Sequence, residues 1–141
     1  MSKLGTLKYR LMQEKREESK EFGKWYARAV QDRVVEFDDF VEHIAHHNST
    51  FSRGTVNGVM MDALDCLKEL VLDGKSVRLA DLGLFSVGIN TKPASTPKTF
   101  TVDKNVAGVH LNVRNTKTWS NAELRKLCNI SELEKNDVVK E

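Results

Sequence analysis

Hydrophobic residues recur at helical spacing in two neighbouring segments of the chain. In residues 37–47 they place Phe37, Phe40, Val41 and Ile44 on one face. After Ser52, a continuous apolar stripe follows the same period. Its members are Val56, Val59, Met60, Ala63, Leu64, Leu67, Leu70 and Val71. The pattern predicts two amphipathic helices, with Ser52 as the N-cap of the second. The second stripe is wide for one small body and indicates a partner, of which the simplest is a second copy.

Beyond Asp73-Gly74 the pattern changes to that of short strands. We expect strands at residues 77–79 and 84–89, joined by a turn at Leu82-Gly83. Residues 108–114 alternate and should return antiparallel to residues 84–91. Gly83 is expected to have either a positive φ or a close backbone neighbour. Ser120 and Glu123 have the spacing of a capping box, which predicts a last short helix.

The two ends of the chain have a different character. Residues 4–12 place Leu7, Tyr9 and Leu11 on one face of a strand. Residues 22–30 suit either a second strand or a short helix, and we favour a strand paired with residues 4–12. The resulting division is a β-hairpin extension at residues 1–35, a main domain at residues 36–128 and a polar, flexible tail at residues 129–141.

Residues 90–107 belong to neither a helix nor a core. They contain both prolines of the chain and three lysines, namely Pro93, Pro97, Lys92, Lys98 and Lys104. Such a segment is usually a disordered loop. Its position between two alternating strands favours a β-arm that extends and becomes ordered on a partner, and β-ribbons fit DNA grooves.

The net charge of +2 hides an uneven distribution of charge. Residues 34–74 hold eight acidic and two basic residues, whereas residues 75–118 hold seven basic and two acidic ones. The first segment therefore carries −6 and the second +5. A basic region beside an acidic body is typical of a nucleic-acid-binding face, although charge alone is equally consistent with an uneven solvated surface.

The segment Gly74-Lys75-Ser76-Val77-Arg78-Leu79-Ala80-Asp81-Leu82-Gly83-Leu84-Phe85 resembles a signature of the HU/IHF family of histone-like bacterial DNA-binding proteins. The resemblance covers roughly residues 36–128, without the family's usual R-N-P-x-T-G arm tip. It implies an α+β fold in which two helices form a dimerisation base under an antiparallel β-sheet saddle with protruding β-arms. It also implies a homodimer in the bacterial cytoplasm, at the nucleoid, that binds and bends double-stranded DNA with little sequence preference.

This resemblance and the charge pattern together predict nine DNA-contacting residues. They are Lys75, Arg78, Lys92, Pro93, Pro97, Lys98, Lys104, Arg114 and Lys117. Either proline, or Phe100, is a candidate wedge between base steps. The alternative is that the prolines only stiffen the arm. Asn90, Asn105 and Asn112 are the candidates for base readout.

Other chemistry is disfavoured by the sequence. His43, His46 and His47 lack further ligands for a tetrahedral metal site. Cys66 and Cys128 lack metal-ligand spacing, and Cys66 falls beside the apolar helix stripe, which favours a buried thiol. No phosphate-binding loop or activated nucleophile is evident. We therefore expect no enzyme activity, cofactor, metal or small-molecule substrate, and no signal peptide or membrane span. The alternative function is a structural protein whose saddle and N-terminal extension bind a protein partner.

Overall fold

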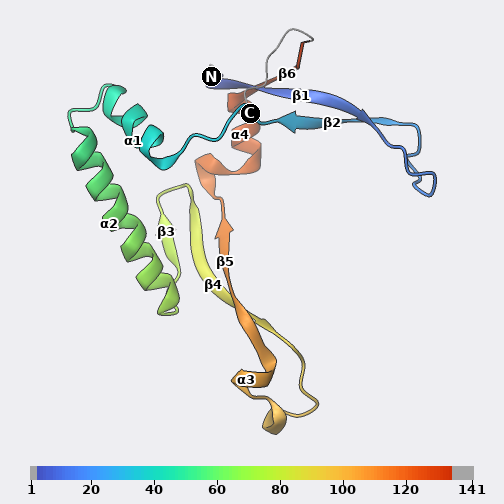
Figure 1. Ribbon diagram of the computed structural model, residues 1–141, viewed down its shortest axis with the longest axis vertical. Coiled ribbons are helices and arrows are strands. Elements are labelled where there is room, and N and C mark those ends of the chain that lie inside the picture. The colour runs from blue at the N-terminus through green and yellow to red at the C-terminus, as the bar shows by residue number, and fades with distance from the viewer. Residues whose placement is uncertain (1–2, 135–141) are drawn as a thin grey trace. The chain divides into compact units, whose positions relative to one another are not determined.

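The structure is a computed structural model and describes residues 3–134 (Figure 1). The chain divides into two compact units. The first unit combines Met1–Phe40 with Ala122–Glu141, and the second is Val41–Asn121. Each unit contains one three-stranded sheet. The mixture of helices with small sheets confirms the predicted α+β class.

The sheet of the first unit has the strand order β2-β1-β6. Strand β1 (Gly5–Gln13) pairs antiparallel with β2 (Trp25–Val30), so the predicted hairpin is present and the helical alternative for residues 22–30 is wrong. Leu7, Tyr9 and Leu11 share one face of β1, as their spacing predicts. Ala27 and Ala29 of β2 lie opposite Leu11 and Tyr9 on that face.

The turn between β1 and β2 is closed by Glu14. Its backbone bonds to Lys24 and Gly23 across the turn. Its carboxylate accepts two hydrogen bonds from the Arg16 guanidinium, at 3.0 and 2.9 Å, and one from the Arg16 backbone N–H at 2.9 Å. The side-chain hydrogen bonds from Arg16 are the main cause that lowers the pKa of Glu14 to about 2.

The flexible tail predicted from residue 129 is wrong for its first residues. After helix α4 (Asn121–Leu127), the chain forms strand β6 (Cys128–Glu132), which pairs parallel with β1. Ile130 lies opposite Leu7, so an isolated apolar residue in a polar run finds its neighbour more than 100 positions away. The remainder of the predicted tail, residues 135–141, lies outside the described residues.

Both helices predicted from the apolar period are present. They are α1 (Phe37–His46) and α2 (Arg53–Leu72). The Ser52 side chain accepts a hydrogen bond from the Thr55 N–H, which confirms it as the N-cap of α2. Gly74 follows α2 with a φ of 82°, a left-handed conformation that favours glycine and ends the helix.

The second sheet has the strand order β3-β4-β5. Strand β4 (Gly83–Thr91) pairs antiparallel with both β3 (Val77–Leu79) and β5 (Val106–Arg114), as predicted. A Cβ at Gly83 would lie 2.8 Å from the Arg114 carbonyl oxygen, so the close backbone neighbour explains this glycine. The positive φ of the turn belongs to Ala80 instead, at 47°.

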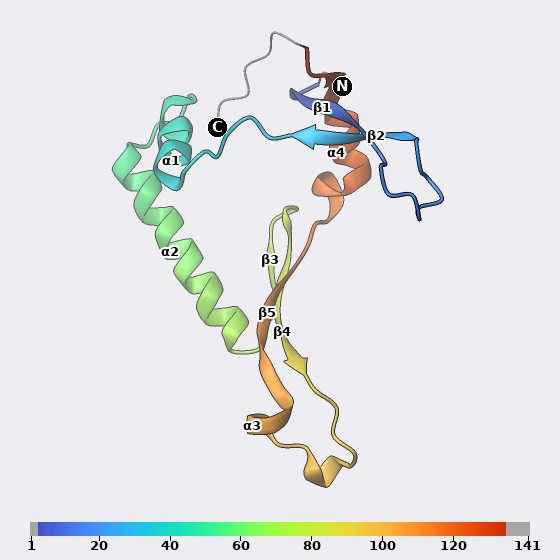
Figure 2. The ribbon, with the colours of Figure 1, turned by 45° about the vertical axis from the view of Figure 1, so that its right-hand side comes forward.

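Strand β3 reaches only as far as Phe85 along β4. From Ser86 onward β4 pairs with β5 alone, and the two strands form a twisted ribbon that runs beyond the end of α2 (Figures 1 and 2). We call residues 86–91 and 106–112 the ribbon, and residues 92–105, which connect its strands, the tip.

The described residues bury little apolar surface within one chain. Val41 and Val71 are the buried hydrophobic residues among them, with 1% and 5% of their surface exposed. The chain exposes 12085 Å² in total. Two separate compact units of about 8 kDa each would together expose only about 8900 Å². Large apolar side chains of α2 and of both sheets are among the exposed residues, and they include Val59, Leu64, Ile89, Leu111 and Trp25.

Candidate nucleic-acid interface

Strand register gives the ribbon two chemically different faces. Directly opposed residues lie on the same face of an antiparallel pair. One face therefore carries Val87 with Leu111 and Ile89 with Val109. Ile89, Val109 and Leu111 each expose about three fifths of their surface, at 59%, 60% and 59%. This apolar face continues towards β3 through the pair of Phe85 and Val113.

The opposite face is polar and has an arginine on each side at its base. Arg78 of β3 and Arg114 of β5 both lie opposite Leu84, so the two guanidinium groups flank one position of β4. Further along the ribbon, Ser86 pairs with Asn112 and Gly88 with His110. The Nδ1 atom of His110 lies 2.6 Å from the Asn90 side-chain oxygen. Hydrogen-bonding groups therefore line this face from its base towards the tip.

The tip is a folded segment with its own hydrogen bonds. A 3-10 turn at Pro97–Thr99 is closed by a capping box between Thr96 and Thr99, and Pro97 occupies its start. The short helix α3 (Val102–Asn105) begins at Thr101, whose hydroxyl accepts from the Lys104 N–H. The threonines of this segment therefore cap two local turns within the chain itself.

Asn105 holds the tip together. It is 8% exposed, the one buried polar residue among those described. Its side-chain oxygen accepts from the Thr101 N–H at 3.0 Å, and its amide donates to the carbonyls of Lys92 and Pro93 at 3.0 and 3.3 Å. Because both ends of its amide are satisfied inside the protein, Asn105 has a structural role, and its nomination for base readout is wrong.

Five of the seven basic residues predicted to contact DNA fall into two groups, and the other two, Lys75 and Lys117, belong to neither group. Lys92, Lys98 and Lys104 lie on the tip, while Arg78 and Arg114 share the base of the polar face. Lys75 forms an ion pair with Asp73 next to the end of α2.

Lys117 lies away from the ribbon strands, in a turn that is tied to Asp81. The hydroxyl of Thr116 donates to the Asp81 carbonyl at 2.9 Å, and that of Thr118 to its carboxylate at 2.7 Å. Lys117 itself has a φ of 45°, which is uncommon for a side chain other than glycine or asparagine. These hydrogen bonds hold the chain in place where it leaves β5. They do not bring Lys117 to the ribbon.

The two prolines have different surroundings. Pro97 and Phe100 line one shallow hollow at the tip with Ala94, Ser95 and Thr96. Phe100 is 41% exposed. The carbonyl of Pro93 accepts from Asn105 instead, and Pro93 does not line this hollow. Two of the three candidate wedges, Pro97 and Phe100, therefore lie next to each other in one exposed apolar patch at the tip.

The histidines and cysteines show no arrangement for metal chemistry in the described residues. The rings of His43 and His47 stack with centroids 5.4 Å apart, and His46 lies 3.6 Å from Glu42. Within residues 3–134 no group of three or more His, Cys, Asp and Glu side chains could hold a metal ion. Cys66 and Cys128 are free thiols, and Cys66 is exposed where a buried thiol was expected. No helix in this part of the chain has the length and apolarity to cross a membrane.

Sequence reasoning missed His110 and Ser86 on the polar face. The signal was present, because His110 alternates with Asn112 and Arg114 along β5. The pairing register with β4 was needed to bring Asn90 to His110 and Ser86 to Asn112.

Helices α1 and α2 precede a three-stranded sheet, and the two longer strands of this sheet carry a basic tip. This arrangement defines an HU-like α+β protein. A model of the family HU-HIG, described as an HU domain fused to a wHTH, Ig or glycine-rich motif, matches residues 6–128. The chain therefore belongs to the HU-HIG family. The match includes the β1–β2 hairpin together with the second unit.

One solved structure shares the fold of this chain. A crystal structure of a Bacteroides vulgatus protein, to which DNA binding is ascribed, is similar over 92% of this chain, with a TM-score of 0.68 and 13% identity. This chain spans 49% of that protein's chain. A structure of Anabaena HU with DNA has 18% identity and a TM-score of 0.39, over 56% of this chain and 84% of that one. No curated protein matches.

We predict that Asn105→Ala loosens the tip without unfolding the protein. The change leaves the Thr101 N–H and two carbonyls without partners, which costs about 1–3 kcal/mol per buried group. Hydrogen exchange should show faster exchange of residues 92–105 and unchanged exchange of α2. Asn112→Ala, on the exposed polar face, is the control and should leave the tip protected. Equal protection of the tip in both variants would contradict the role of Asn105.

Proposed function

We propose that this protein is an architectural homodimer that binds and bends double-stranded DNA with little sequence preference. The observation that carries the proposal is the ribbon, because one molecule combines a polar face flanked by Arg78 and Arg114 with a tip that bears three lysines. Membership of the HU-HIG family and the ascribed DNA binding of the Bacteroides vulgatus relative support it. We place the protein in the bacterial cytoplasm, at the nucleoid.

Electrostatic attraction supplies the affinity in this proposal. Lysine and arginine side chains neutralise phosphates and release condensed counterions, a process that depends on salt and not on sequence. A two-stranded ribbon is narrow enough to enter a groove of the duplex. The polar face would then meet base edges and sugars through Asn90, His110 and Asn112, while the lysines of the tip hold the backbone.

Bending is assigned to the exposed apolar patch at the tip. Minor-groove architectural proteins insert apolar side chains between base steps, which kinks the duplex. Pro97 and Phe100 share one hollow and are the strongest candidates here, with Pro93 as the third. The internal hydrogen bonds of the tip favour this role, because a wedge must keep its shape while it unstacks bases.

A second copy of the chain is the partner that fits the remaining apolar surface. Ile44, Phe51, Val56, Val59 and Met60, with Thr55, line a hollow between α1 and α2 that has no polar lining. Val59 and Phe51 are 64% and 63% exposed within one chain. In a C2 dimer, the same surfaces of the two protomers face each other. Such a dimer would cover this patch and the apolar ribbon face of both protomers. No cofactor, metal, small molecule or catalytic step enters the proposed mechanism.

Simultaneous replacement of Lys92, Lys98 and Lys104 by Ala tests DNA binding directly. The slope of log affinity against log salt should fall by about 0.9 for each phosphate that is no longer neutralised, or about 2.7 per protomer. Titration of a fluorescent duplex at several salt concentrations gives the slope. Lys15 and Lys20 lie in the β1–β2 turn, and their replacement by Ala should change the slope less per lysine removed. An unchanged slope in the triple variant would favour the protein-partner alternative.

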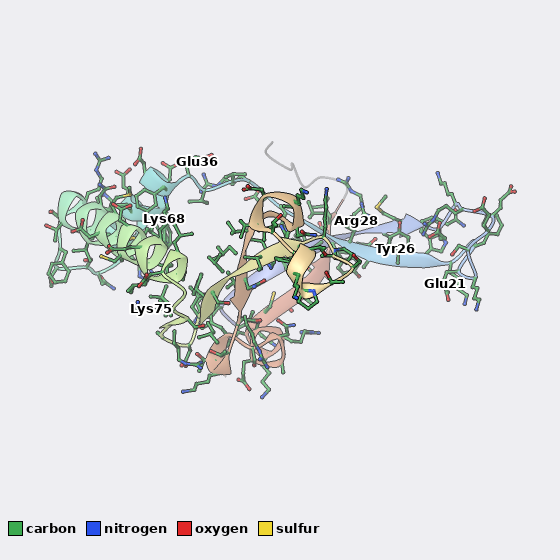
Figure 3. The ribbon with its side chains drawn as sticks, turned by 90° about the horizontal axis from the view of Figure 1, so that it is seen from below. Glu21, Tyr26, Arg28, Glu36, Lys68 and Lys75 are labelled. Carbon is green, nitrogen blue, oxygen red and sulfur yellow. The ribbon has the colours of Figure 1, made fainter. Side chains whose placement is uncertain are left out.

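The dimer is tested at Val59, which is exposed in one chain and covered in the proposed assembly. Val59→Asp should dissociate the dimer by at least about 100-fold, because an unpaired carboxylate is costly to bury. Lys68, labelled on α2 in Figure 3, is nine residues beyond Val59. At 3.6 residues per turn this spacing puts the two residues on opposite sides of the helix. Lys68→Asp should therefore remain dimeric. Sedimentation equilibrium distinguishes the variants, and a folded monomeric parent at micromolar concentration would refute the dimer.

The wedge is tested by its effect on DNA shape. Replacing Pro93 and Pro97 by Ala, singly and together, should reduce bending more than affinity, because the lysines attract DNA either way. We expect the larger change at Pro97. Energy transfer between the ends of a doubly labelled duplex measures the bend, and thermal unfolding should be nearly unchanged. A double variant that bends DNA like the parent would move the wedge to Phe100.

A further inference from the structure

The sheet of the first unit also has two unlike faces. Register places Lys8, Arg10 and Met12 of β1 opposite Val30, Arg28 and Tyr26 of β2. These six residues share one face, which we call the basic face. The other face carries Leu7, Leu11 and Ile130 with the two alanines of β2, and Trp25 at its end.

Two arginines stand directly opposite each other on the basic face. Arg10 of β1 is the register partner of Arg28 of β2. Like charges in directly opposed positions destabilise an antiparallel pair, with Cβ atoms only about 5 Å apart. Both side chains are exposed, and neither makes a hydrogen bond or an ion pair with the described residues. The six residues of the face include no carboxylate.

Tyr26 extends the face beside the arginines. It lies two residues from Arg28 on β2 (Figure 3) and is 41% exposed. Arg10, Met12 and Tyr26 line an open hollow that continues into the turn, where Lys15 and the ion pair of Arg16 with Glu14 also line it. Guanidinium groups bind phosphate through two parallel hydrogen bonds, and tyrosine hydroxyls also donate to phosphate oxygens. An anion between Arg10 and Arg28 would relieve the repulsion that the sheet otherwise retains.

We propose that the basic face is a second contact for the phosphate backbone of duplex DNA, centred on Arg10 and Arg28. The inference rests on the proposed function and adds a surface of the N-terminal hairpin to the ribbon of the second unit. The contact would carry no sequence information, because phosphate contacts position a protein on the duplex without reading its bases. An acidic protein surface is the competing ligand, and crosslinking distinguishes it from DNA.

The test is duplex titration of the full chain carrying R10A and R28A. If each arginine neutralises one phosphate, the salt slope falls by about 1.8 per protomer. Compared with the parent, the variant then loses about 60-fold more affinity at 0.1 M salt than at 1 M salt for each protomer in contact. The R10K/R28K variant retains both charges and should keep most of the slope. Thermal unfolding should occur at the same or a higher temperature in R10A/R28A, because the cross-strand repulsion is removed.

The matched control removes the same charge elsewhere in the same unit. K20A/R33A alters two exposed cations of the first unit that lie outside the basic face and do not line its hollow, and it should lower the slope by less than half as much as R10A/R28A. Equal reductions of the slope in the two double variants would mean diffuse attraction and would overturn the site. So would unaltered binding by R10A/R28A.

The tip variant separates the two proposals. A parent that binds DNA, is weakened by K92A/K98A/K104A and is unaffected by R10A/R28A keeps the proposed function and overturns only this inference. A parent that does not bind duplex DNA overturns both. Crosslinking supplies direct support, because a photoreactive phenylalanine analogue at Tyr26 should label the duplex in the parent background. Labelling of an added polyglutamate chain in preference to the duplex would assign the face to acidic proteins and refute the DNA contact.

Discussion

A sheet one layer thick has two faces, and this chain covers neither of its two sheets completely. The β4–β5 ribbon exposes Ile89 and Leu111 on one side and a row of hydrogen-bonding groups on the other. The hairpin sheet repeats the division, with Leu11 and Trp25 on one face and the opposed arginines on the other. Burial of apolar area at roughly 25 cal/mol per Å² favours covering the first kind of face. The second kind presents charged and hydrogen-bonding groups to solvent.

The same constraint explains why the tip needs Asn105. A ribbon without a second layer has no core in which to anchor a connecting segment of fourteen residues, from 92 to 105. Threonine caps and a buried amide replace hydrophobic packing there. Polar groups that hydrogen-bond to one another give the tip a defined shape without a hydrophobic core. The tip can therefore keep this shape while Pro97 and Phe100 remain exposed to solvent.

Much of the fold followed from local patterns in the sequence. The 3.6-residue period identified α1 and α2, and Ser52 marked the start of α2 because its hydroxyl caps the helix. Alternation identified β4 and β5 and their pairing. These elements depend on neighbours close in sequence, which a periodic pattern records directly. The basic residues of the tip were likewise visible as composition.

Features that depend on pairing between distant segments could not be predicted from the sequence. Nothing local marks Asn105 as a buried clamp or sets Arg10 against Arg28, because each arrangement appears only once register is known. Residues Cys128–Glu132 look like a polar tail until β1 lies beside them.

That last pairing has a consequence for biosynthesis. Gly5 pairs with Cys128, and the Lys3 ammonium donates to the Lys126 carbonyl at 2.8 Å, so the sheet of the first unit joins segments from opposite ends of the sequence. Contacts this far apart form late, because a long loop must close first. During synthesis, residues 5–13 and 25–30 leave the ribosome before residues 128–132 are made, so any β1–β2 hairpin formed by then has an open edge at β1. A chaperone that shields strand edges would act in that interval.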